Sequence, residues 1–139
     1  MIPTKRYGLA LVVLVVLSPG CGEIKNLLSP DKASSSSSSQ SFTGTLAVGG
    51  SSSFTFTVGQ AGTVNATLTS LGGSSPVGLG IGTPGGTTSC QLATSSQSTT
   101  AGTSPQVSAK ETAGSYCVCV FDTGSLAAAT TFAVTVTHP

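Results

Sequence analysis

Hydrophobic and polar residues alternate in short runs over most of the chain after residue 40. Five runs are clear, and in each of them every second residue is apolar or aromatic: 54–58, 64–68, 77–81, 116–120 and 132–136. A period of two places these residues on one face of a β-strand and the intervening Thr, Asn, Gly, Cys and Ala on the other. Weaker candidates follow the same pattern less regularly, at 42–48, 88–93 and 104–109. We therefore predict seven or eight strands.

Turn-forming residues separate the predicted strands at close spacing. They lie at 49–50, 59–62, 72–73, 84–86, 113–114 and 122–124. Short strands with frequent turns are typical of an antiparallel sandwich, and no stretch of this region has the period of an amphipathic helix. We predict an all-β sandwich over residues 41–139, with Phe56, Val118 and Val134 pointing into its core.

The N-terminus has the pattern of an export signal. Lys5 and Arg6 precede an apolar run at 8–17, and this run is shorter than the roughly 20 residues that a helix needs to cross a bilayer. A basic start, a short apolar stretch and small residues after it are typical of a secretory signal peptide. The sequence therefore predicts a signal peptide over residues 1–20.

The residues around Cys21 resemble the processing site of bacterial lipoproteins. Gly20 and Cys21 match that pattern, whereas Ser18 and Pro19 depart from its preferred Leu and Ala or Ser. We predict that Cys21 is lipidated; plain secretion after an ordinary cleavage is the alternative. Several acyl chains on one Cys would anchor the protein stably, since each buried CH₂ contributes about 0.8 kcal/mol. Gly22 in place of Asp resembles the outer-membrane sorting pattern, so we expect an outer-membrane lipoprotein on the periplasmic face or the cell surface.

Residues 21–40 read as a flexible tether that ends in a run of six serines at 34–39. Such chains behave as coils with a span of about 5–6 Å × √n, which gives this tether a reach of roughly 25 Å.

Charge is scarce along the whole chain. Charged residues make up 6% of its 139 residues and hydrophobic ones 38%. From Cys21 onward, three Lys and four acidic residues leave a net charge of −1. Nucleic-acid binding needs clustered Lys and Arg, so this class of partner is excluded. Long-range electrostatic attraction is not how this protein finds a partner.

The closing strands resemble a known bacterial family. Gly114-Ser-Tyr-Cys-Val-Cys-Val, a turn with Gly, and Thr131-Phe-Ala-Val-Thr-Val match the ending of the pre-peptidase C-terminal domain family. The resemblance covers residues 41–137 and implies a jelly-roll-like sandwich that serves as an accessory module of secreted proteins. Many members carry Asp residues after the third strand; here that place holds Val77-Gly-Leu-Gly-Ile-Gly, so a calcium-supported version is not expected.

If Cys21 carries lipid, three cysteines remain, and an oxidising compartment favours a disulfide between two of them. Cys117 and Cys119 lie on the same face of one predicted strand, about 6.5–7 Å apart, at the upper limit for a disulfide. We predict the pair Cys90–Cys117, with Cys90–Cys119 as the alternative. The remaining thiol is either half-buried and inert or joins two chains.

Few residues offer catalytic or metal-binding chemistry. His138 is the sole histidine and is expected in a frayed terminus, while Glu111 and Asp122 are expected as solvated loop charges. The Cys117-x-Cys119 spacing departs from common zinc sites, and two acids are too few for a calcium site. We therefore expect no enzyme, no cofactor and no metal.

These observations predict a non-catalytic interaction module of the cell envelope that docks a protein or polymer partner. Tyr116 and most Phe residues fall in phase with the core, whereas Phe42 and Phe121 are expected to be exposed contact residues. A carbohydrate-binding module is one alternative, weakened because the chain has no Trp and only Tyr116 after the signal peptide. Thr-rich strands without edge lysines favour another alternative, a self-associating structural lipoprotein.

Overall fold

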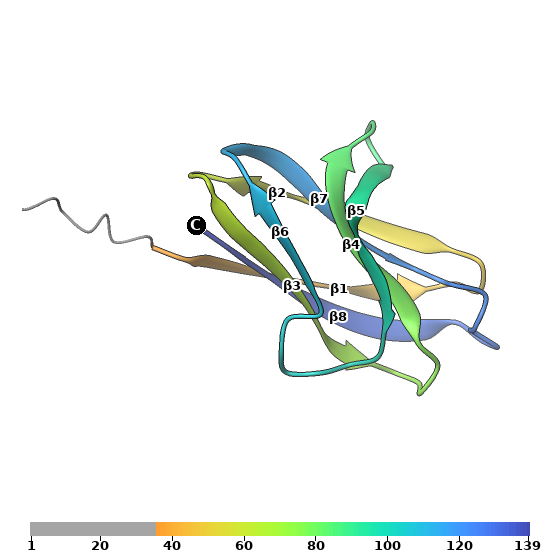
Figure 1. Cartoon of the computed structure of the whole chain (residues 1–139). Helices are drawn as coiled ribbons and strands as arrows, with labels where there is room; N and C mark the ends of the chain where they lie inside the picture. Colours follow the sequence, from red (N-terminus) through yellow and green to blue (C-terminus); the bar gives the residue numbers. More distant parts are fainter. Residues whose placement is uncertain (1–35) are drawn as a thin grey trace, which may run out of the picture. The chain divides into compact units, whose positions relative to one another are not determined.

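Eight β-strands make up residues 36–139, the part of the chain that this computed structural model describes (Figure 1). They are β1 (Ser38–Leu46), β2 (Ser51–Val58), β3 (Gly62–Leu71), β4 (Val77–Pro84), β5 (Cys90–Thr99), β6 (Val107–Glu111), β7 (Gly114–Phe121) and β8 (Thr130–His138). Each of the five clear alternating runs lies within one of these strands. Residues 36–139 contain no helix long and apolar enough to span a membrane. The predicted signal peptide, Cys21 and most of the tether lie outside the described residues.

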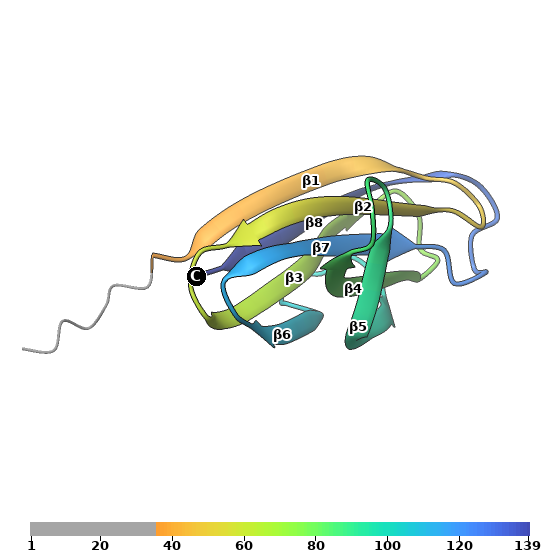
Figure 2. The same ribbon diagram turned by 90° about the horizontal axis from the view of Figure 1, so that it is seen from above.

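Two antiparallel four-stranded sheets pack face to face (Figures 1 and 2). Sheet A has the order β1-β8-β3-β6 and sheet B the order β2-β7-β4-β5. Consecutive strands therefore change sheets at every connection except the β4–β5 hairpin. This order is that of an eight-stranded jelly roll, so the predicted fold class is confirmed.

The core lies between the two sheets and consists of the apolar half of each alternating run. Val118 and Val134 have no exposed surface, and Phe56 is 4% exposed, as the alternation predicts. Tyr116 and Phe132 are also buried, while Phe54 is half-buried and packs against this core. Burial of each large apolar side chain contributes about 1.5–3 kcal/mol, which makes this interior the main source of stability.

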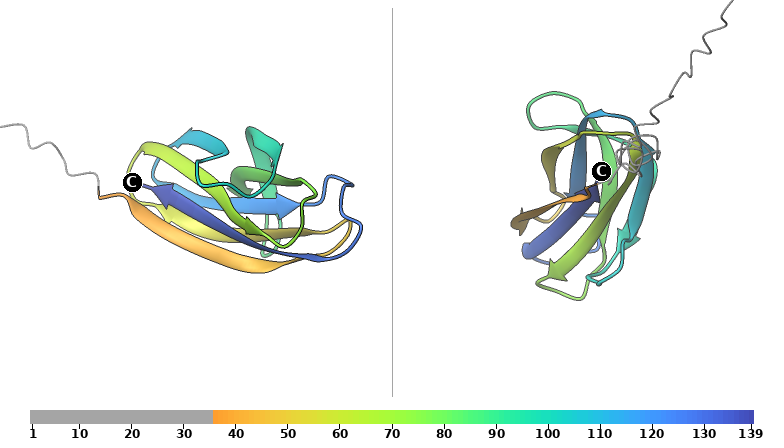
Figure 3. Two further views of the ribbon diagram at one scale, coloured as in Figure 1. Left: turned by 90° about the horizontal axis from the view of Figure 1, so that it is seen from below. Right: turned by 90° about the vertical axis from the view of Figure 1, so that its left-hand side faces the viewer.

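β1 begins at Ser38, three residues before the predicted start of the domain at residue 41. Its partner is β8, the blue strand beside the orange β1 in Figure 3. Ser38 lies opposite His138 and Leu46 opposite Thr130. The side chains of residues 38–41 are all exposed. They carry no apolar signal, and pairing with β8 along the backbone is what makes this segment a strand.

The chain end is ordered, which corrects the expectation that His138 is frayed. β8 continues its alternation to His138, whose side chain points into the sandwich and is 4% exposed. The His138 ring stacks on Phe56 with 5.6 Å between ring centroids. Glu111 is likewise the last residue of β6, opposite Gly62, rather than a loop residue.

Candidate functional site

The β4–β5 hairpin folds over the outer face of sheet B, as Figure 2 shows. On that face β4 presents a row of buried glycines, Gly78, Gly80 and Gly82. A Cβ at Gly82 would collide with the backbone carbonyl of Gln91, and one at Gly80 would lie 2.7 Å from the Leu92 side chain. The glycine row is therefore what allows β5 to lie so close to β4.

Two bonds fix this hairpin to the strands beneath it. The disulfide Cys90–Cys117 joins the start of β5 to β7, with 5.8 Å between the two Cα atoms, and confirms the preferred pairing. The hydroxyl of Ser53 in β2 donates a hydrogen bond of 2.9 Å to the Thr88 carbonyl in the hairpin turn. The hairpin consequently covers parts of both β7 and β2.

Cys119 is the cysteine left without a disulfide among the described residues. It points to the same face as Cys117 and is only 7% exposed. Burial raises the pKa of its thiol, so the protonated form predominates at neutral pH. Because the thiolate is the reactive form, both the burial of Cys119 and its raised pKa protect it from reagents in solution.

Asp122 organises the loops at the end of the sandwich opposite Ser38. Its carboxylate accepts hydrogen bonds from the backbone N–H groups of Gly49 at 2.7 Å and of Gly124 at 2.8 Å. Two longer bonds come from Ser125 at 3.0 Å and Leu126 at 3.2 Å. The Gly49 bond, more than the others, holds the pKa of Asp122 below its usual range. The predicted solvated loop charge is therefore a clamp between the β1–β2 turn and the β7–β8 loop.

The clamped turns and their neighbour form one surface, which we call the distal loops: residues 47–50, 72–75 and 122–129. Gly72 donates a backbone hydrogen bond of 2.8 Å to Thr131 and so ties the β3–β4 turn to the base of β8. A shallow hollow of about 290 Å³ lies between residues 72–75 and 126–130. The residues that line it carry no charge, and elsewhere in the distal loops Val48 is 55% exposed.

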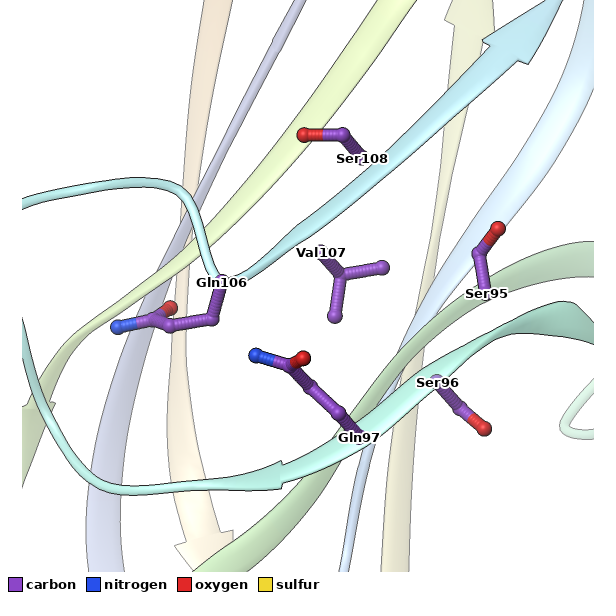
Figure 4. Close-up of a pocket in the computed structure, with 6 residues that line it drawn as sticks. All are labelled: Ser95, Ser96, Gln97, Gln106, Val107 and Ser108. Carbon is purple, nitrogen blue, oxygen red and sulfur yellow. The ribbon is translucent and has the colours of Figure 1, made fainter.

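A second hollow, of about 270 Å³, lies between β5 and β6 on the open side of the sandwich (Figure 4). Its lining is polar apart from Val107, and it includes Gln97 and Gln106. The Gln106 side chain is committed to the fold, because its carbonyl oxygen accepts a hydrogen bond of 2.7 Å from the Leu68 backbone N–H. The lining of this hollow contains no acidic or basic side chain, and its serine hydroxyls are its only nucleophiles.

The two predicted contact residues are less exposed than the sequence suggested. Phe42 is half-buried and stacks on Phe54, with 4.9 Å between ring centroids. Phe121 is also half-buried, and its ring covers Gly78 on the outer face of β4. Each ring is only partly exposed, because it packs against a neighbour that the fold brings close to it.

Within residues 36–139, no three His, Cys, Asp or Glu side chains gather as metal ligands would. The carboxylate of Asp122 is occupied by backbone donors, and His138 lies in the core. Comparison with known proteins gives no further guide: no protein family matches the chain, and no curated protein matches it significantly.

Proposed function

We propose that this protein is a non-catalytic interaction module of the bacterial cell envelope that docks a protein partner through its distal loops. The observation that carries the proposal is the Asp122 clamp, which fixes two turns that are 73 residues apart in sequence. Loops at the end of a rigid sandwich are common binding sites, and loops held in advance lose less entropy when they bind.

The chemistry of this surface favours an uncharged, partly apolar partner surface. Asp122 is the only charged residue in the distal loops, and its carboxylate faces inward to the backbone donors. Ala127, Ala128 and Ala129 are exposed and line the hollow, and Val48 is exposed on the β1–β2 turn. Exposed apolar side chains on ordered loops are surface that a protein partner can bury at little cost in entropy.

We propose further that the module is exported and held at the outer membrane by lipid on Cys21, as a relative of the pre-peptidase C-terminal domains. The disulfide is compatible with an oxidising compartment, and the jelly-roll order supports the resemblance. Ser38 and the distal loops lie at opposite ends of a nine-residue strand, a separation of about 30 Å. An anchor before Ser38 would therefore attach at the end of the sandwich opposite the distal loops, and the flexible tether would leave these loops free to meet a partner.

Metabolic labelling with palmitate tests the anchor. The wild-type chain is expected to incorporate label and to enter the detergent phase after extraction, and Cys21→Ser to do neither. Cys119→Ser is the matched control and should behave as wild type, since its thiol is buried. Equal labelling of Cys21→Ser and wild type would contradict lipidation at this residue.

Site-specific photo-crosslinking in cells tests the distal loops. A crosslinking residue at Val48 or Ala128 should give discrete protein adducts, and one at Thr69, exposed on β3, should give none. Adducts of the same size and yield from all three positions would rule out docking through the distal loops.

The two alternatives have unequal support. Sugar platforms expose aromatic rings, yet Tyr116 is buried, with its hydroxyl donating to the Thr112 carbonyl at 3.0 Å, and every Phe is buried or half-buried. A self-associating structural lipoprotein is favoured by one observation: β1 is an edge strand of sheet A, with β8 as its one neighbour in that sheet among residues 36–139.

A further inference from the structure

The sandwich has four edge strands, β1 and β6 in sheet A and β2 and β5 in sheet B. An edge strand presents unpaired backbone N–H and C=O groups, and proteins usually protect them with charges, irregular register, short length or a covering segment. The four edges of this protein differ sharply in such protection.

Three of the edges are protected. β6 is only five residues long and ends in Lys110 and Glu111. The register of β5 shifts where it passes Gly80 and Gly82, and its first residue is held by the disulfide to β7. β2 lies partly under the hairpin turn that bonds to Ser53, and both Ser52 and Ser53 are half-buried.

β1 has none of these protections in the described part of the chain. It runs for nine residues, Ser38–Leu46, without a charged residue or a proline, and its register with β8 is unbroken from end to end. Figure 2 shows it along one margin of the sandwich. Phe42, at its midpoint, remains partly exposed even after stacking on Phe54.

We propose that β1 is a self-association edge, at which a second copy of the chain pairs its own β1 antiparallel to the first. A two-fold axis near Phe42 would join the two copies of sheet A into one continuous sheet of eight strands. Such a contact is isologous, so each copy supplies the same strand and receives the same strand. This inference is independent of docking at the distal loops, which lie at the end of β1.

A second copy fits this edge for reasons of charge and shape. Residues 36–139 contain one Lys and two acids, a net charge of −1 with His138 neutral, so two copies repel each other weakly. The other copy offers a strand of equal length with the same absence of charge. Around the axis, the half-exposed Phe42 ring of each copy would gain a partner ring, which removes apolar surface from water.

Light scattering during size-exclusion chromatography tests the proposal. Residues 36–139 contain the whole core, from Leu46 to Val136, and are suitable for the measurement. The wild-type fragment should show a mass that rises from monomer to dimer with concentration. Thr43→Lys with Thr45→Lys, two exposed positions on β1, should weaken the dimer at least about tenfold, because the new charges approach each other across the axis.

Thr55→Lys with Thr57→Lys is the matched control, since it adds the same charge at two exposed positions on β2. This control should leave the dimer unchanged. A nitroxide label on Thr43 should show dipolar coupling between copies, and a label on Thr57 should not. A wild-type fragment that stays monomeric, or equal weakening by both double variants, overturns the proposal.

A longer chain, from Gly22 to Pro139, separates self-association from coverage by the chain's own N-terminal segment. The proposal requires this chain to dimerise like the shorter one. If the longer chain is monomeric while residues 36–139 dimerise, the N-terminal segment occupies the edge and the proposal fails.

Discussion

The carboxylate of Asp122 joins two turns that are far apart in sequence but adjacent at one end of the sandwich. It accepts four backbone hydrogen bonds, from Gly49 and from residues 124–126. These bonds favour the charged form, above all the one from Gly49, and so lower the pKa of Asp122. Folding is therefore linked to the ionisation of this side chain.

We expect Asp122→Asn to lower Tm by a few degrees at neutral pH and to flatten the acid limb of the stability curve. A carboxylate whose pKa is lowered by folding stabilises the protein fully above about pH 4, the ordinary aspartate pKa, and this stabilisation is lost as pH falls through the lower folded value. Thermal unfolding between pH 2 and pH 7 measures both effects. Parallel curves for wild type and Asp122→Asn would show that the clamp does not depend on charge.

Gly82 is the position where the hairpin backbone comes closest to β4. A Cβ there meets the backbone carbonyl of Gln91, which cannot rotate away as a side chain could. We expect Gly82→Ala to destabilise the fold by about 1–3 kcal/mol, the usual effect of overpacking, as measured by urea unfolding. Gly59→Ala is the control, since its nearest neighbour is the Pro139 carbonyl at 4.0 Å. If Gly59→Ala lowers the free energy of unfolding by as much, the destabilisation comes from replacing glycine in the backbone and not from a clash with the hairpin.

The position of a residue could be predicted from the sequence where burial follows the alternation. It could not be predicted where the residue's partner is a backbone group. Phe56, Val118 and Val134 were placed correctly because a period of two fixes the face of each side chain. The clamp by Asp122 was missed because its partners are N–H groups, which carry no sequence signal. The alternating Gly78, Gly80 and Gly82 did give a signal, since glycine at every second position predicts a close approach on one face.

At the scale of elements, the β4–β5 hairpin depends on its disulfide to β7. The bond closes a loop with a sequence separation of 27. On the chain-entropy account, its removal in Cys90→Ser with Cys117→Ser should lower the free energy of unfolding by about 3–4 kcal/mol, measurable by urea titration.

The same double variant should uncover Cys119. Without the link to β7 the hairpin can open, so a thiol reagent should modify Cys119 faster than in wild type under native conditions. Single Cys119→Ser, which keeps the disulfide, serves as the control for reagent specificity. Equal labelling rates in wild type and the double variant would mean that the hairpin covers Cys119 without help from the disulfide.

Whole elements were predictable in proportion to their burial. The five clear runs became β2, β3, β4, β7 and β8. β5 extends to Thr99, well past the predicted 88–93. The pattern missed its second half because the residues there are mainly exposed and polar. β1 gains its first four residues, 38–41, only through pairing with β8. Edge strands with polar side chains lack the period that marks buried ones.

At the scale of the molecule, the sequence pattern does not determine which strands pair. Sheet A joins the first strand to the last, with Ser38 opposite His138, and places β8 between β1 and β3. Pairing of β1 with β8 closes a loop over nearly all of residues 36–139 before β1 gains a hydrogen-bonded neighbour in sheet A. Alternation fixes which face is buried but is silent on partners so distant in sequence.

This topology predicts slow folding. Because β8 must reach the centre of sheet A before β1 has any partner in it, most of the ordering entropy is lost before the gain in burial. We expect residues 36–139, with the disulfide intact, to refold in milliseconds to seconds, the range of sandwiches rich in long-range contacts. Tyr116 fluorescence after rapid dilution from urea is a suitable probe, since its ring is buried only in the folded state and the chain has no Trp. Deletion of residues 130–139 should abolish this phase, because it removes a central strand of sheet A. Refolding of residues 36–139 in microseconds would contradict the prediction. A cooperative unfolding transition in the deletion variant would also contradict it, since sheet B and part of sheet A would then fold without β8.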